Sequence, residues 1–261
     1  KRKNIVFPYP TFSLYEVFVK INGFKSIKIP YNKNDYKLNY KKLINSIDEN
    51  TAIVFLPNPN VPIEGYLDQS KVIDIAKKCN KHKCLLVIDE VYFHYGSKSA
   101  LNLINNYTNI LILRSLSKGF GLPGLRVGYI ISNKQNIEYL SKNRVGYEVN
   151  SITIVTSLVF LTNKSFLKNY TSEVKNNLKL IKDKMTKLNI ITVGGDYGNY
   201  IFIDFKNKSK CAYITKKLHN HKIIVRDNWP KPFDTGILIS GTSKKNTLFF
   251  LKKFLQVIKV K

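Results

Sequence analysis

Short apolar runs recur along the first half of the chain, each about the length of one strand. Leu85–Ile88 and Ala52–Leu56 are apolar throughout, which is typical of strands buried on both faces of a parallel sheet. Between them, Leu67–Asn80 carries apolar residues at helical spacing, namely Val72, Ile75, Ala76 and Cys79. The order strand, helix, strand predicts an α/β fold with a mostly parallel sheet.

An acid and a phenol follow the apolar run at 85–88. Asp89 comes directly after Ile88, and Tyr92 comes three residues later. In open α/β sheets, ligands bind at the carboxyl ends of the strands. The sequence therefore predicts that Asp89 faces a ligand.

A glycine-rich loop follows a further apolar run, Ile110–Leu113. Within it, Lys118 is accompanied by Ser115 and Ser117, and Arg126 follows eight positions later. A lysine amine reacts with carbonyl compounds only when part of it is neutral, and hydroxyls, loop N–H groups and a guanidinium can together bind a phosphate. The pattern indicates an imine-forming lysine beside an anion pocket. The alternative is a solvated lysine in a glycine-rich turn.

Asp89 and Tyr92, followed by Ser115-Leu-Ser117-Lys118 and Arg126, resemble the pyridoxal-phosphate aminotransferases of fold type I. The histidinol-phosphate aminotransferase branch, which also includes phospho-amino-acid decarboxylases, is the most similar. The resemblance runs along nearly the whole chain. It implies an aspartate aminotransferase-like, cofactor-binding large domain over residues 1–148, a smaller α+β domain over 149–261, and a homodimer.

The resemblance also implies roles for single residues. Lys118 would hold pyridoxal 5′-phosphate as an imine and act as proton shuttle, Asp89 would pair with the ring nitrogen, and Tyr92 would bond the ring oxygen. The other implied contacts are stacking by Phe12, a ring-oxygen bond from Asn60, phosphate binding by Ser115, Ser117 and Arg126, and substrate binding by Asn199 and Arg226.

The chain departs from the family pattern in three places. Family members have several dozen residues before the point that corresponds to Lys1, so the chain is expected to be N-terminally incomplete relative to them. Val61 stands where many members have Asn before Pro, and Leu238 stands where an arginine normally grips the substrate anion. With Arg226 as the remaining anchor, we expect transamination between an amino donor and a phosphate-bearing or keto acceptor. The alternatives are phospho-amino-acid decarboxylation and a non-catalytic relic of the fold.

The second half of the chain reads as a mixture of helices and strands. The expected order is long helices over residues 152–188, strands at 190–193 and 199–205, a helix at 210–218, strands at 223–226 and 236–240, and a helix at 245–258.

The net charge of +26 would ordinarily suggest binding to nucleic acid. Only five of the 43 basic residues are Arg, and Lys is spread along the chain without a dense block, so we expect no specific nucleic-acid partner.

The three cysteines lack metal-type spacing, so we expect no metal site and a reducing cytoplasm. No apolar run is long enough to span a bilayer and no signal-peptide pattern is visible, so no membrane association is expected.

Overall fold

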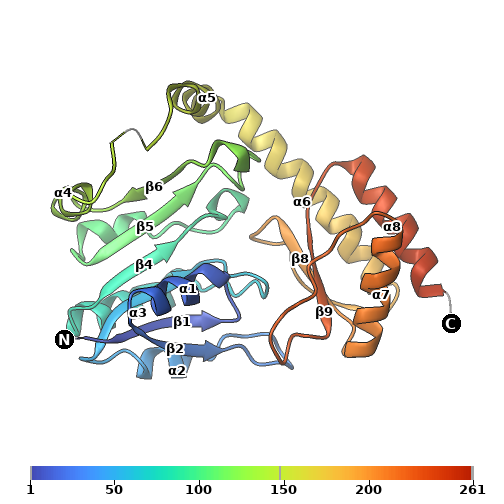
Figure 1. The fold of residues 1–261 in the computed structure, drawn as a ribbon, viewed down its shortest axis with the longest axis horizontal. Helices are drawn as coiled ribbons and strands as arrows, with labels where there is room; N and C mark the ends of the chain where they lie inside the picture. Colours follow the sequence, from blue (N-terminus) through green and yellow to red (C-terminus); the bar gives the residue numbers. More distant parts are fainter. Residues whose placement is uncertain (1, 147, 260–261) are drawn as a thin grey trace.

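Six strands from the first half of the chain form one sheet in the order β2-β1-β3-β4-β5-β6. The computed structural model describes residues 2–146 and 148–259. The strands are β1 (Asn4–Tyr9), β2 (Lys25–Pro30), β3 (Thr51–Pro57), β4 (Leu85–Asp89), β5 (Ile110–Ser115) and β6 (Gly128–Ile131). All pair in parallel except β6, which is antiparallel to β5. The predicted α/β fold with a mostly parallel sheet is confirmed (Figure 1).

Four α-helices in the described part of the chain accompany this sheet. They are α1 (Ser13–Ile21), α2 (Tyr40–Asn45), α3 (Gln69–Lys81) and α4 (Lys134–Ser141). Helix α3 begins after Asp68, whose side chain accepts a hydrogen bond from the Lys71 N–H, a favourable N-cap. The four apolar residues predicted on its inner face are all buried. Burial of Val72 and Ile75 contributes about 1.5–3 kcal/mol each, which holds α3 on the sheet.

The second half of the chain builds a three-stranded antiparallel sheet in the order β7-β8-β9. Its elements are α5 (Ser151–Thr162), α6 (Lys164–Thr186), β7 (Ile191–Gly194), β8 (Tyr200–Asp204), α7 (Lys208–Asn220), β9 (Gly236–Ser240) and α8 (Lys244–Lys259). Figure 1 shows α7 and α8 on the side of this sheet that faces away from the six-stranded sheet. None of the helices in the described ranges is both long and apolar enough to span a membrane.

The strand predicted at 223–226 is wrong. Only Arg226 pairs there, through a single antiparallel bridge to Leu238 in β9. Lys222 has a left-handed φ of 63°, and the side chain of Ile224 is 85% exposed. The segment therefore has no buried face that would hold it along the sheet.

The segment that follows β4 packs into the core of the second half of the chain. Tyr92 and Tyr95 belong to the same buried cluster as Leu178 of α6 and Tyr200 of β8. The end of β4, and with it the predicted ligand site, therefore lies at the junction of the two halves.

Candidate active site

A cavity of about 1000 Å³ lies at this junction. Five of the predicted site residues line it: Phe12, Tyr92, Lys118, Asn199 and Arg226. The first three follow the carboxyl ends of β1, β4 and β5, where parallel strands bring side chains to one edge of a sheet. The last two come from the second half of the chain, so the cavity combines residues of both halves.

Lys118 lies in the turn directly after β5. Its Nζ atom is 5.7 Å from the centroid of the Tyr92 ring, and burial lowers the pKa of its amine. Its carbonyl accepts a hydrogen bond of 3.0 Å from the Tyr95 hydroxyl. Gly119 packs so closely on His94 that a Cβ there would overlap the imidazole. The backbone of the lysine loop is thus fixed by the turn after β4.

Asp89 is the last residue of β4, and each of its carboxylate oxygens accepts a hydrogen bond. The Tyr15 hydroxyl donates to Oδ2 at 2.5 Å, and the Val91 N–H donates to Oδ1 at 3.0 Å. Burial raises the pKa of Asp89, and the bonds from Tyr15 and Val91 oppose that shift. The two donors thus offset part of the desolvation that would otherwise favour the neutral carboxyl.

Tyr92 and Phe12 offer an aromatic and hydrogen-bonding lining. The Tyr92 ring meets Tyr200 edge-on at 5.0 Å, and burial raises the pKa of its hydroxyl, which therefore remains a donor. Phe12 is 45% exposed, so it is not an ordinary core residue, and its ring edge contacts Tyr15 at 5.8 Å.

Asn60 is fully buried and links the segment after β1 to the segment after β3 by hydrogen bonds. Its Nδ2 donates to the carbonyls of Pro10 and Ile63 at 3.0 and 3.2 Å, and its Oδ1 accepts from the Thr11 hydroxyl at 2.6 Å. Both amide protons are therefore used. The ring-oxygen contact from Asn60 stays a prediction, and the Tyr92 hydroxyl is the other candidate donor.

The predicted phosphate residues lie on the two limbs of the lysine loop. The Ser115 hydroxyl is 2.9 Å from both the Ser117 hydroxyl and the Val127 carbonyl, so it closes the loop. Arg126 precedes Val127, has a left-handed φ of 55°, and is exposed, with Nη1 donating to the Pro123 carbonyl at 3.1 Å. The structure places these residues around one loop but outside the lining of the cavity.

Arg226 contributes a guanidinium group to the lining of the cavity. Its Cζ lies 4.0 Å from the centroid of the Trp229 ring, and its backbone pairs with Leu238, with N–O distances of 2.8 and 3.4 Å. Leu238 also lines the cavity. An arginine at position 238 would therefore stand opposite Arg226 on neighbouring backbone.

Several residues that support the site were not predicted from the sequence. Tyr15 binds Asp89, Tyr95 binds the lysine loop, and Glu90 pairs with Arg114 at 2.8 Å. Phe12 directly precedes α1 and Tyr15 lies in its first turn, so a spacing of three residues brings the two side chains together. This spacing is the feature of the sequence from which Tyr15 could have been predicted.

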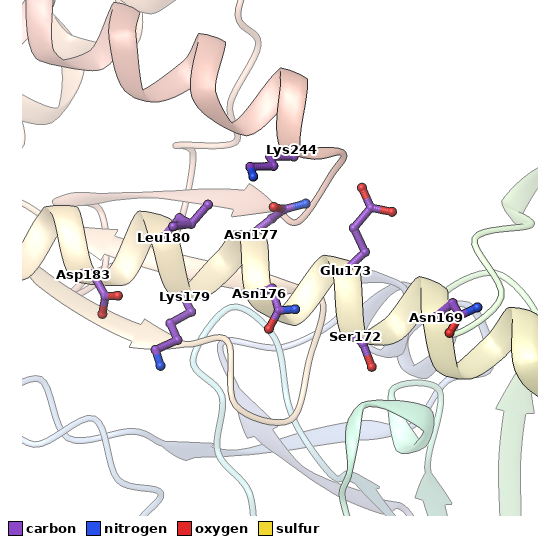
Figure 2. Close-up of a pocket in the computed structure, with 9 residues that line it drawn as sticks. All are labelled: Asn169, Ser172, Glu173, Asn176, Asn177, Lys179, Leu180, Asp183 and Lys244. Carbon is purple, nitrogen blue, oxygen red and sulfur yellow. The ribbon is translucent and has the colours of Figure 1, made fainter.

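A groove of about 820 Å³ along α6 is a different feature. Figure 2 shows its polar lining along one helix, with Lys244 of α8 beside it. Asn177 in this groove donates to the Thr242 carbonyl at 2.7 Å, which ties α6 to the segment before α8. None of the predicted site residues lines the groove, so we locate the chemistry at Lys118.

The fold is that of the fold type I aminotransferases. The structure of histidinol-phosphate aminotransferase from Sinorhizobium meliloti with pyridoxal-5′-phosphate superposes with a TM-score of 0.90 at 22% identity, over 99% of this chain and 71% of that chain. The Clostridium acetobutylicum histidinol-phosphate aminotransferase gives 0.88 at 22% identity, over 98% and 78%. The model of the aminotransferase class I and II family matches residues 1–237, and the chain belongs to this family.

Curated relatives are similar over most of this chain. Histidinol-phosphate aminotransferase of Thermoanaerobacter pseudethanolicus is 32% identical over 225 residues, which cover 85% of this chain and 62% of that protein. The Methanosphaera stadtmanae protein of the same name is 29% identical over 84% of this chain and 59% of its own length. The chain thus spans about three-fifths of the length of these relatives.

Proposed function

We propose that this chain carries the catalytic site of a pyridoxal-phosphate-dependent aminotransferase that acts on a phosphate-bearing small molecule, similar to histidinol phosphate. The observation that carries the proposal is a lysine with a lowered amine pKa in a cavity that is also lined by an aromatic ring, a phenol and a guanidinium. The names of the relatives support the same reading.

The residues present fit the cofactor. The exposed Phe12 ring suits stacking on a planar heterocycle, the Asp89 carboxylate suits a protonated ring nitrogen, and the Tyr92 hydroxyl suits a ring oxygen. Ser115, Ser117 and Arg126 are proposed for the phosphate. In this proposal, residues 1–148 bind the cofactor, and residues 149–261 supply Asn199 and Arg226 for the substrate.

The proposed mechanism assigns each side chain a task. When bound, pyridoxal phosphate supplies an electron sink that stabilises negative charge at the substrate Cα. Lys118 Nζ, whose pKa burial lowers, would take the proton from that carbon and deliver it to C4′ of the cofactor. Arg226 binds the anionic group of the substrate through charge-assisted hydrogen bonds. Tyr200 packs edge to face against Tyr92 and supports the position of its ring.

We further propose that the protein works as a homodimer in a reducing compartment. Helix α5 lies at the margin of the molecule (Figure 1). Its apolar side chains are widely exposed, with Ile152 at 79%, Val155 at 62% and Leu158 at 57%, and exposed apolar patches of this kind mark association surfaces. All three cysteines are unpaired and buried.

The decisive experiment uses the visible absorbance of the purified protein. With pyridoxal phosphate added, the wild type should gain an absorption band and become covalently labelled on reduction with borohydride, while Lys118→Ala should do neither. Lys222→Ala is the matched control, because Lys222 lines the same cavity, and it should behave as the wild type does. Equal labelling of the Lys118→Ala protein would disprove the assignment.

A further inference from the structure

Tyr15 connects two of the side chains proposed to contact the cofactor ring. Its hydroxyl donates to Asp89 Oδ2 at 2.5 Å, although the two residues are 74 positions apart. Its ring edge meets the Phe12 ring at 5.8 Å with an interplanar angle of 89°. Among the described residues, no other side chain makes an aromatic or hydrogen-bonding contact with both of them.

The position of the Tyr15 hydroxyl is fixed by the surroundings of its ring. The ring stacks on Phe55 of β3 at 4.8 Å and 7°, meets Phe7 of β1 at 6.4 Å, and leaves only 6% of the residue exposed. A ring held on three sides by other aromatic rings can direct its hydroxyl to one place only. That place is one oxygen of Asp89.

The Asp89 carboxylate depends on this hydroxyl. Its other oxygen is occupied by the Val91 N–H, and among the described residues Asp89 has no lysine or arginine partner within ion-pair distance. A buried carboxylate without a cation is kept charged by the donors it accepts from. Removing the Tyr15 hydroxyl would leave one oxygen unbonded and the carboxylate free to turn.

We propose that Tyr15 is a positioning residue of the site: it holds the Asp89 carboxylate in the orientation and charge state that bind a protonated ring nitrogen, and it supports the Phe12 ring. This inference rests on the proposed function. It makes a specific claim, because an effect transmitted through Asp89 must depend on the ring nitrogen of the ligand.

The test compares two ligands and two variants in cofactor-free purified protein. The ligands are pyridoxal phosphate and its analogue in which C–H replaces the ring nitrogen. The variants are Tyr15→Phe and the matched control Tyr36→Phe, whose hydroxyl donates to Asp204 Oδ2 at 2.6 Å but which does not line the Lys118 cavity. Both variants keep the ring and its packing. The dissociation constant of each ligand is measured by equilibrium dialysis.

We expect Tyr15→Phe to weaken the binding of pyridoxal phosphate about tenfold or more, the usual scale for a hydrogen bond to a charged group. Binding of the analogue should change much less, and Tyr36→Phe should bind both ligands as the wild type does. In turnover, Tyr15→Phe should lower kcat while the KM of the amino donor stays the same.

The outcomes separate this inference from the function on which it rests. If the wild type binds no pyridoxal phosphate, the proposed function fails and this inference fails with it. If the wild type binds pyridoxal phosphate and Tyr15→Phe binds it equally well, or loses the same factor for both ligands, Tyr15 has no role through Asp89. The proposed function would then stand without it.

Discussion

Glu90 and Arg114 form a buried ion pair that joins the end of β4 to the end of β5. Glu90 Oε2 accepts from Arg114 Nε at 3.1 Å and from Nη2 at 2.8 Å, and the two side chains are only 2% and 11% exposed. The Glu90 carboxylate also accepts hydrogen bonds from the Ala100 N–H and from the Ser99 hydroxyl. Glu90 follows Asp89 directly, and Arg114 precedes Lys118 by four residues, so the pair fixes the two strands that carry the proposed chemistry.

Breaking this ion pair should cost stability far more than breaking an exposed one. Removal of one partner leaves a buried, uncompensated charge, so Glu90→Gln should lower the free energy of unfolding by about 3 kcal/mol. Glu138→Gln is the control, because its pair with Lys134 at 3.7 Å is exposed and should change stability by less than about 1 kcal/mol. Urea unfolding measures both; equal losses would contradict a structural role for the buried pair.

His94 should make the stability of the protein depend on pH below neutrality. Burial, assisted by Arg114, lowers the pKa of His94 to about 4, against about 6.5 in an unfolded chain. As the pH falls, the unfolded chain therefore binds the proton first, so the stability present above pH about 6.5 is lost progressively towards pH about 4.

Between pH 7 and 5 the free energy of unfolding of the wild type should fall by about 1 kcal/mol more than that of His94→Gln. This value is smaller than the full pKa shift implies, because solvent screens a partly exposed group. His219→Gln, at an exposed position on α7, is the control and should follow the wild type. Urea unfolding at the two pH values measures the difference. Parallel losses in the wild type and His94→Gln would show that folding does not lower the pKa of His94.

Leu238 should influence which amino substrate is used. Leu238 lies opposite Arg226 and lines the same cavity, so Leu238→Arg would add a second anion-binding group beside the first. We expect this variant to raise kcat/KM for glutamate about tenfold relative to that for the phosphorylated substrate, whereas the uncharged control Leu238→Gln should not. An unchanged kcat/KM for the phosphorylated substrate in Arg226→Ala would refute Arg226 as its anchor.

The apolar surface of α5 should control the oligomeric state. Val155→Lys and Leu158→Lys each place a charge in the proposed interface, where desolvation of an unpaired charge is costly, and should shift the protein from dimer to monomer in sedimentation velocity. Tyr213→Lys, an exposed aromatic position on α7, is the control and should remain dimeric. A monomeric wild type at micromolar concentration would rule out this interface.

The sequence predicted those parts of the fold that depend on local patterns. The helical spacing of Val72, Ile75, Ala76 and Cys79 gave the buried face of α3 correctly, and the fully apolar runs identified the buried strands. A run of apolar residues at 223–225 misled the prediction, because Ile224 points into solvent and only Arg226 reaches β9.

The residues proposed for the site were predictable by type, but their bonding partners were not. Tyr15 and Asp89 belong to different elements, and only the pairing of β1 with β3 and of β3 with β4 brings them together. For Asn60, the resemblance of the loop after β3 to the family pattern suggested a ligand contact. In the structure its side-chain amide is hydrogen-bonded to Thr11, Pro10 and Ile63. Hydrogen bonds between distant segments leave no periodic signal in the sequence.

The Tyr15–Asp89 bond also bears on how the protein folds. It spans 74 positions and requires three adjacent parallel strands, so it belongs to the non-local contacts whose loop-closure entropy slows folding. Helical content should therefore return early in refolding, and the capacity to bind cofactor should return late. In a cell, the site proposed for the cofactor would therefore be complete only after these three strands have paired.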